Sequence, residues 1–381
     1  MPRLIKIEEN LKINYAKEIK EYLNPDNVYI PYEKKYNVDI KSNEYVLLNG
    51  LVLHNDDDYV YSPISGTIIG ASESIVDGKK APTIVIENDF KEKTYKVKGV
   101  LKDITNYKPD EFKNTIKIYN AYNGPLEGET LVISGIDYEP YEETMSFLIK
   151  SHTNEILECI DAISHILQIH KCFFAIKNND SDNVKTLVDQ IGTYPNINLK
   201  LMPDLYPIGQ KDILINELVT EKKKDKGVIF LTVEDVFAIY NVLKKKKPIT
   251  EKLITISGDL IDKPAVMLVK IGTNIGDIIA NFFKVKDENF KIVINGLLSG
   301  YTIPSLNAVV TPLTRSIFIT SEQQEKARKC INCGLCVLHC PVKANPKEKL
   351  RMDKCIKCGL CNYICPSKIK LMGGKKWKMY L

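Results

Sequence analysis

The sequence predicts a multidomain α+β protein built from four consecutive parts. Three observations indicate this architecture. Short strand-like segments fill the first part, strands alternate with helical segments in the middle, and eight of the ten cysteines lie between Cys330 and Cys365. A chain of 381 residues is also too long for one ordinary domain. We predict the domain bounds 1–93, 94–250, 251–320 and 321–381.

The first part has the pattern of a β sandwich. Strand-like segments at 28–31, 45–50 and 83–86 are separated by Asn, Asp, Gly and Pro. Residues 61–70 resemble the β-turn of biotinyl- and lipoyl-type sandwich domains. Those carriers present a modifiable lysine at a hairpin tip, flanked by Met or Asp, and this segment has none. The sequence therefore favours a barrel-sandwich-like scaffold at 1–93 over a carrier domain.

The second part alternates strands and helices, which is typical of an α/β layered domain. A buried strand at 131–134 precedes a long helix, predicted over 142–170 because its apolar residues recur with a period near 3.6. Further strands and helices are predicted at 172–176, 182–191, 199–202, 228–232 and 233–247.

The third part, 251–320, returns to β structure. Two predicted strands, 253–259 and 265–270, flank the turn 261–264, and a short helix is predicted at 277–281. This small ubiquitin-like, or β-grasp, layout is typical of docking and spacer elements.

Eight cysteines in the fourth part form two runs with one pattern, C-x2-C-x2-C-x3-C-P. This is the spacing of bacterial ferredoxins with two [4Fe–4S] clusters, in which the fourth cysteine of each run binds the other cluster. The glycine in each loop suits a tight turn that brings backbone N–H groups toward sulfur. Each fourth cysteine is expected to begin a short helix. Predicted cluster one uses Cys330, Cys333, Cys336 and Cys365; predicted cluster two uses Cys355, Cys358, Cys361 and Cys340.

Disulfides and structural zinc are weaker alternatives for these cysteines. Disulfides are disfavoured because no secretion signal is apparent. Structural zinc usually takes pairs of C-x2-C hairpins, without a three-plus-one exchange. The remaining cysteines, Cys159 and Cys172, lie in apolar segments and are predicted to be core residues. We expect His339, beside Cys340, to be a surface residue.

The charge is concentrated at the C-terminal end. Residues 321–381 carry a net charge of +10, so the rest of the chain sums to −5. Negative cluster thiolates give this excess a direct explanation, and no aromatic stripe accompanies it, which disfavours nucleic-acid binding. No run of about 18 apolar residues is present. We therefore expect no membrane insertion and a cytoplasmic protein, with any membrane contact peripheral, at the inner face of the cell membrane.

Several short motifs outside the cysteine runs carry a family resemblance. They are Ser62-Pro63-Ile64-Ser65-Gly66, Glu139-Pro140-Tyr141, Tyr206-Pro207-Ile208-Gly209-Gln210-Lys211, Ser257-Gly258-Asp259 with Pro264, and Ile271-Gly272-Thr273. With the order of domains, they resemble the RnfC-like family, the C subunit of Rnf-type electron transport complexes, over nearly the whole chain. Among its soluble relatives, the chain is closest in type to the electron-transfer protein associated with proline reductase.

The resemblance implies that 94–250 is similar to the FMN- and NADH-binding subunit of respiratory complex I, and that 251–320 is an SLBB-like domain. In that family a glycine-rich loop lets backbone N–H groups approach the flavin phosphate. Here the stretch 101–135 has only Gly124, Gly128 and Gly135, and 106–114 cannot form a dense phosphate cradle. Either Glu139 and its neighbours bind FMN through side chains, or the domain persists as a scaffold that presents the clusters. The scaffold is favoured.

Three functions follow from these predictions. The favoured one is an iron–sulfur protein that relays single electrons through two [4Fe–4S] clusters to or from a partner reductase or Rnf-type complex. The alternative is an FMN-dependent, NADH-oxidising subunit of a membrane-bound Rnf-type complex. In the third, the clusters only hold the C-terminal fold together for docking. In each case the partners are redox proteins, and no stand-alone catalytic residue is predicted.

Overall fold

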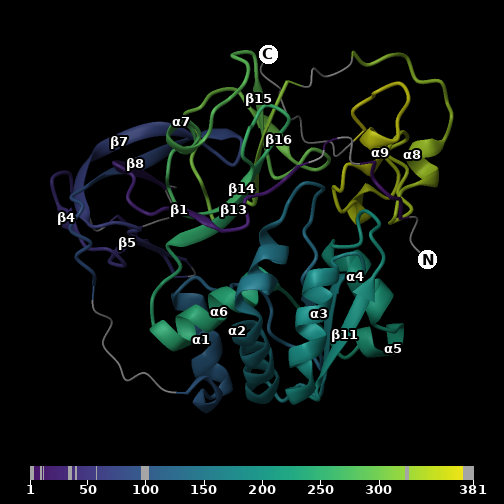
Figure 1. Cartoon of the computed structure of the whole chain (residues 1–381), viewed down its shortest axis with the longest axis horizontal. Helices are drawn as coiled ribbons and strands as arrows, with labels where there is room; N and C mark the ends of the chain where they lie inside the picture. Colours follow the sequence, from purple (N-terminus) through teal and green to yellow (C-terminus); the bar gives the residue numbers. More distant parts are fainter. Residues whose placement is uncertain are drawn as a thin grey trace.

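The computed structural model describes residues 4–8, 11, 13–32, 37–38, 41–56, 58–95, 103–321 and 326–371, which form four sheets and a small C-terminal lobe. The sandwich strands, the β-grasp sheet, the α/β layer and the lobe lie against one another (Figure 1). Within these residues, no helix combines the length and apolar character needed to cross a bilayer.

Two antiparallel sheets form the N-terminal sandwich. One has the order β2-β8-β7-β4 and the other β3-β5-β6. Gly66 opens β7 where a Cβ atom would lie 1.9 Å from the carbonyl oxygen of Glu87, so only glycine allows this strand to pair with β8. The strands are β2 (Asn27–Pro31), β3 (Asn37–Val38), β4 (Tyr45–Val46), β5 (Leu51–His54), β6 (Tyr59–Tyr61), β7 (Gly66–Val76) and β8 (Lys79–Asn88).

The α/β part is a parallel sheet in the order β11-β10-β9-β12, covered on both faces. Alternation along β9 sends Leu131 and Ile133 to the face under α1, α2, α3 and α6, and Val132 to the face under α4. The strands are β9 (Thr130–Ser134), β10 (Lys171–Lys177), β11 (Ile197–Met202) and β12 (Val228–Thr232). The helices are α1 (Pro109–Ile118), α2 (Thr144–Ile166), α3 (Ser181–Gln190), α4 (Lys211–Leu218), α5 (Glu221–Lys224) and α6 (Val233–Lys245).

Helix α1 was not among the elements that the sequence predicted. It begins at Pro109, which suits the first helical position because its missing N–H would be unpaired there. Asp110 and Glu111 follow in the first turn, where negative charge is favoured. The segment lacks a phosphate loop, as predicted, because it is a helix.

The β-grasp sheet has six strands in the order β1-β14-β13-β17-β15-β16, with α7 (Ile275–Phe282) packed on its apolar face. Its edge strand β1 (Lys20–Tyr22) comes from the N-terminal part of the chain and pairs in parallel with β14. The sequence did not predict this strand. The others are β13 (Glu251–Ser257), β14 (Ala265–Lys270), β15 (Lys291–Ile294), β16 (Tyr301–Ile303) and β17 (Ser316–Thr320).

The C-terminal lobe, yellow at the upper right of Figure 1, contains two short helices, α8 (Leu335–Leu338) and α9 (Leu360–Tyr363). Each follows a left-handed glycine and contains the third cysteine of its run. The expectation that each fourth cysteine begins a helix is therefore wrong. Cys340 and Cys365 instead follow the helices, because each helix begins directly after the glycine turn.

Candidate functional site

The two cysteine runs adopt the same backbone conformation. We call residues 330–340 the outer loop and residues 355–365 the inner loop. Positive φ angles recur at equivalent positions 25 residues apart. The pairs are Asn332 (56°) with Lys357 (56°), Gly334 (74°) with Gly359 (73°), and Lys343 (56°) with Lys368 (53°). A repeated sequence has therefore produced a repeated shape, as expected if each loop wraps the same kind of group.

The fourth cysteine of the outer run lies with the inner loop. One cavity of the lobe is lined by Cys340 together with Cys355, Cys358 and Cys361, and has no exposed polar surface. Burial, and then the nearby Cys333 and Cys365 thiols, raise the pKa of Cys336, so the fourth cysteine of the inner run lies near the outer loop. The geometry thus brings together the thiols that the spacing assigns to one cluster.

The donor set fits an iron–sulfur cube. In a cube each of the four thiolates binds a different iron, so the sulfurs stand farther apart than the ligands of a single ion. In the part of the chain that the structure describes, no three His, Cys, Asp or Glu side chains are placed to hold one metal ion. Burial raises the pKa of Cys358 to about 11 and that of Cys361 to about 12, and a bound cluster would stabilise their thiolates.

The two loops differ in their surroundings. Cys330 and Cys333 of the outer loop are exposed, whereas Cys358 of the inner loop is 8% exposed. A Cβ atom on Gly334 would meet nothing within 4 Å, but one on Gly359 would lie 1.8 Å from the carbonyl oxygen of Leu298. The inner loop is therefore pressed against the body of the protein, and the outer loop faces solvent.

A small apolar cluster holds the inner loop in place. Leu360 and Cys358 pack against Tyr206, and Ile5 and Leu298 lie at the edge of this cluster. Ile5 pairs with Tyr206 through two backbone hydrogen bonds of 3.0 and 2.7 Å. Three separate segments of the chain, around residues 5, 206 and 298, thus form the platform on which the lobe rests.

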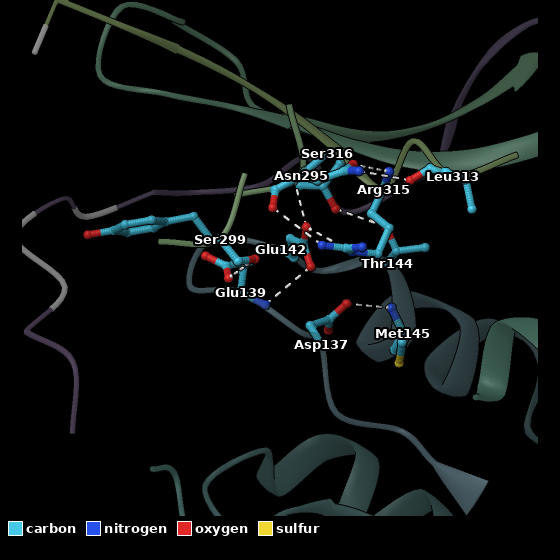
Figure 2. A network of polar contacts seen from close by, with 12 residues as sticks. Asp137, Glu139, Glu142, Thr144, Met145, Asn295, Ser299, Leu313, Arg315 and Ser316 are labelled. Carbon is cyan, nitrogen blue, oxygen red and sulfur yellow. Dashed lines mark hydrogen bonds and ion pairs between the residues drawn. The ribbon is translucent and has the colours of Figure 1, made fainter. Parts of the chain in front are cut away.

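Glu139 lies at the centre of the polar contacts beside this platform (Figure 2). Its carboxylate accepts hydrogen bonds from the backbone N–H of Leu298 at 2.9 Å and from the hydroxyl of Ser299 at 2.6 Å. The Tyr206 hydroxyl lies 2.8 Å from the same carboxylate. Glu139 is 3% exposed, and burial raises its pKa to about 7. The carboxylate therefore joins the α/β domain to the 295–300 turn and to the platform.

Glu142 extends the same network into the β-grasp sheet (Figure 2). It accepts a hydrogen bond of 2.7 Å from the Ser316 hydroxyl on β17, and its carboxylate lies 3.5 Å from Nε of Arg315. Burial raises its pKa, while the positive charge of Arg315 opposes that rise. These contacts fix the loop between β9 and α2 against the neighbouring sheet.

The residues predicted for flavin binding do not fit FMN as they stand. All three glycines of the candidate phosphate stretch are already covered by this chain: Gly124 by Tyr122, Gly128 by Gly227, and Gly135 by Ile149 and neighbouring side chains. The Glu139 oxygens have three donors of their own. None of these three glycines is open to a phosphate, and we therefore derive no step through a flavin.

Sequence reasoning missed three residues of this site. Tyr206 stands out in the sequence only as part of a motif, and no pattern marks Leu298 or Ser299. Their partner Glu139 is 67, 159 and 160 residues away in sequence. The only local signal was the pair of glycines at 296 and 300, which allow the close turn beside Glu139.

Two family models match parts of the chain. Residues 103–243 match the Nuo51 FMN-binding domain, and residues 327–344 match the 4Fe-4S binding domain. The first match supports FMN as a cofactor and the second supports 4Fe–4S clusters. The second match covers the outer run only. With the fold and the paired cysteine loops, these matches indicate a chain with an FMN-binding-type domain and a 4Fe–4S motif.

The curated relatives give a narrower resemblance. The chain is 27% identical over 357 residues to the C subunit of an ion-translocating oxidoreductase complex of Haemophilus influenzae, covering 84% of this chain and 54% of that protein. The protein of the same description from Serratia proteamaculans is 28% identical over 62% of this chain and 35% of its own length. The chain is thus similar to these C subunits, and it spans about half the length of the first of these relatives.

These relatives support the alternative predicted function better than the favoured one, because none of those named above is a proline-reductase-associated protein.

A solved NAD+-reducing [NiFe]-hydrogenase in the air-oxidized state also shows a likeness, at a TM-score of 0.45 and 14% identity, over 55% of this chain and 46% of that one. We draw no argument from a likeness this distant.

Proposed function

We propose that this chain is an electron-relay subunit of an Rnf-type oxidoreductase complex and holds two [4Fe–4S] clusters. The outer cluster would be held by Cys330, Cys333, Cys336 and Cys365, and the inner cluster by Cys355, Cys358, Cys361 and Cys340. When bound, such clusters supply one-electron transfer. The observation that carries the proposal is the cavity in which Cys340 joins the three cysteines of the inner loop.

The chain gives the two sites different tasks. Cys358 of the inner loop is buried on the platform, close to the FMN-type domain, and Gly359 and Leu360 are buried beside it. The outer loop exposes Cys330 and Cys333, so a partner protein can approach that site closely. This difference in exposure supports a relay with an internal side and a partner-facing side.

The partner would be a redox protein with an acidic surface. The lobe and its flanks carry a net charge of +10, and complementary charge speeds the encounter of such partners at low salt. A membrane-bound Rnf-type complex is favoured by the relatives described above. A soluble reductase of the proline-reductase-associated type is the other acceptor that the sequence predicts.

The basic residues of the lobe should also affect the outer cluster. Lys343, Lys347 and Lys349 are exposed, and Lys347 donates a 2.7 Å hydrogen bond to Asn332 in the outer loop. Replacing all three by glutamine is expected to lower the potential of the outer cluster. The reduced cluster is more negative than the oxidised one, and the substitutions remove the positive charges that stabilise it. Surface charges are screened by salt. The shift, measured by EPR-monitored titration, should fade at high ionic strength; an unchanged potential at low salt would contradict this prediction.

A second candidate function is NADH oxidation through bound FMN. The match of residues 103–243 to an FMN-binding domain favours it. Flavin absorbance in the purified protein, bleached by NADH, would support this function. A flavin-free protein that still accepts electrons would exclude it.

The test of the relay is the anaerobic visible spectrum with iron, zinc and flavin quantified. We expect about eight irons per chain and reversible reduction of two EPR-active clusters. Zinc in the lobe, or far fewer irons, would overturn the proposal. Full iron without reversible reduction would instead support clusters that only stabilise the fold.

A further inference from the structure

The Tyr206 hydroxyl lies between a buried acid and the backbone of a predicted cluster ligand. It is 2.8 Å from Oε1 of Glu139 and also within hydrogen-bond distance of the carbonyl oxygen of Cys358. Tyr206 and Cys358 are each 8% exposed. The hydroxyl has one hydrogen, so it can donate to only one of these oxygens at a time. The carboxylate is therefore one side chain away from the inner loop.

Tight packing fixes Glu139 in this position. A Cβ atom on Gly296 would lie 2.1 Å from Cγ of Glu139, so the 295–300 turn lies directly against the acid. The same turn contacts the inner loop, where Leu298 meets Gly359. Neither the acid nor the loop can shift without disturbing the other, and their separation is a fixed feature of the fold.

The outer loop has no comparable neighbour among the described residues. Cys333, the equivalent of Cys358, is exposed, and Gly334 has open space on its Cβ side. The charged groups nearest in sequence to the outer loop are basic, and Lys347 contacts it directly through Asn332. Lys354 and Lys357 are exposed beside the inner loop as well, so the surroundings of the two predicted clusters differ chiefly by the buried carboxylate of Glu139.

We infer that Glu139 is a positioning residue that lowers the electron affinity of the inner cluster relative to the outer one, and that the Tyr206 hydroxyl, as a donor beside it, partly offsets this effect. This rests on the proposed function, since it requires both clusters. Reduction adds one negative charge to a cube, which a buried carboxylate disfavours and nearby lysines favour. In a chain that holds a single electron, the outer cluster would therefore be reduced and the inner cluster oxidised. The electron moves between the clusters without any bond being broken or any proton being transferred. The exposed site, facing the partner, is then the more favourable place for that electron.

The expected size of the effect is measurable. A unit charge roughly 10 Å from a redox group, at an effective dielectric constant of about 20, changes the ratio of its two redox states about tenfold. For a one-electron couple, a tenfold change corresponds to about 59 mV. Burial makes the effect of Glu139 less sensitive to salt than that of the surface lysines.

The experiment uses the cluster-loaded chain, titrated potentiometrically at about pH 8.5, above the pKa of Glu139 of about 7. Glu139→Gln keeps the size of the side chain and an oxygen for the N–H of Leu298. It is expected to raise the potential of one cluster by about 59 mV and leave the other unchanged. Glu73→Gln is the matched control, because it removes the same charge from an exposed position on β7 of the sandwich, outside the lobe, and should shift neither cluster appreciably.

Tyr206→Phe separates an electrostatic role from a structural one. It keeps the carboxylate but removes the hydroxyl that donates toward it and toward Cys358, so the inner cluster should become harder to reduce. The two variants are therefore expected to shift the same cluster in opposite directions. Shifts of equal sign, equal shifts of both clusters, or no shift would overturn the inference. A wild-type chain without two reducible clusters would instead overturn the proposed function.

Discussion

Replacing Cys340 together with Cys358 is expected to leave one intact cube and about four irons per chain. Replacing Cys340 together with Cys333 is expected to leave no intact cube. The reason is that Cys340 lies in the cavity of the inner loop, with Cys355, Cys358 and Cys361, although it follows the outer run in sequence. The first pair thus removes two ligands of one cluster, and the second removes one ligand from each.

Iron quantification and the EPR spectrum of the reduced protein measure this outcome. Cys159→Ala is the matched control, since this cysteine is buried in α2, far in sequence from both runs, and should leave the iron content unchanged. If the double variant with Cys333 kept about four irons and the variant with Cys358 kept none, the fourth cysteine would serve its own loop. The prediction that the two runs exchange their fourth cysteines would then be wrong.

Gly359→Ala is expected to destabilise the docking of the lobe far more than Gly334→Ala. Both glycines have nearly the same left-handed conformation, with φ of 73° and 74°, so both substitutions cost about 1 kcal/mol in backbone strain. Only at Gly359 does the new methyl group meet a backbone atom, the carbonyl oxygen of Leu298 at 1.8 Å. Because that oxygen belongs to the turn that holds Glu139, we expect a further cost of about 3 kcal/mol.

Anaerobic thermal unfolding of the two cluster-loaded variants, with the rate at which the visible spectrum bleaches in air, measures this difference. Gly359→Ala should unfold at a lower temperature and bleach faster, since the lobe must move away from its platform. Gly334→Ala should remain close to the wild type in its bleaching rate. Equal behaviour of the two variants would mean that the inner loop is not held against the body.

Local patterns in the sequence predicted most of the α/β layer. The apolar period of the segment 142–170 predicted a long helix, observed as α2 (Thr144–Ile166), and the strand predicted at 228–232 is β12. Helix α1 was missed because Lys108-Pro109 has the composition of a turn, although proline also suits the first position of a helix. Such ambiguities are local, and only the packing of Phe112 and Ile116 into the core resolves them.

The assignment of the ligands stays a prediction from the sequence, and the surroundings of the two loops could not be predicted at all. The spacing of the cysteines specifies two loops and an exchange, because both depend on short distances along the chain. Sequence alone could not show that Glu139 contacts Leu298 and Tyr206, since no periodicity links residues so far apart. For the same reason, the sequence could not show which loop is buried, or which predicted cluster would face the partner.

The parallel pairing of β1 with β14 has a consequence for synthesis. On the ribosome, β1 emerges long before β14, the strand with which it pairs. The N-terminal segment therefore stays unpaired while the sandwich and the α/β layer form. An edge strand without its neighbour is open to association with other chains. Lys20 and Glu21 place opposite charges in β1, which makes such association less favourable. A nascent chain that lost this segment would leave β14 as a bare apolar edge, and we would expect it to aggregate.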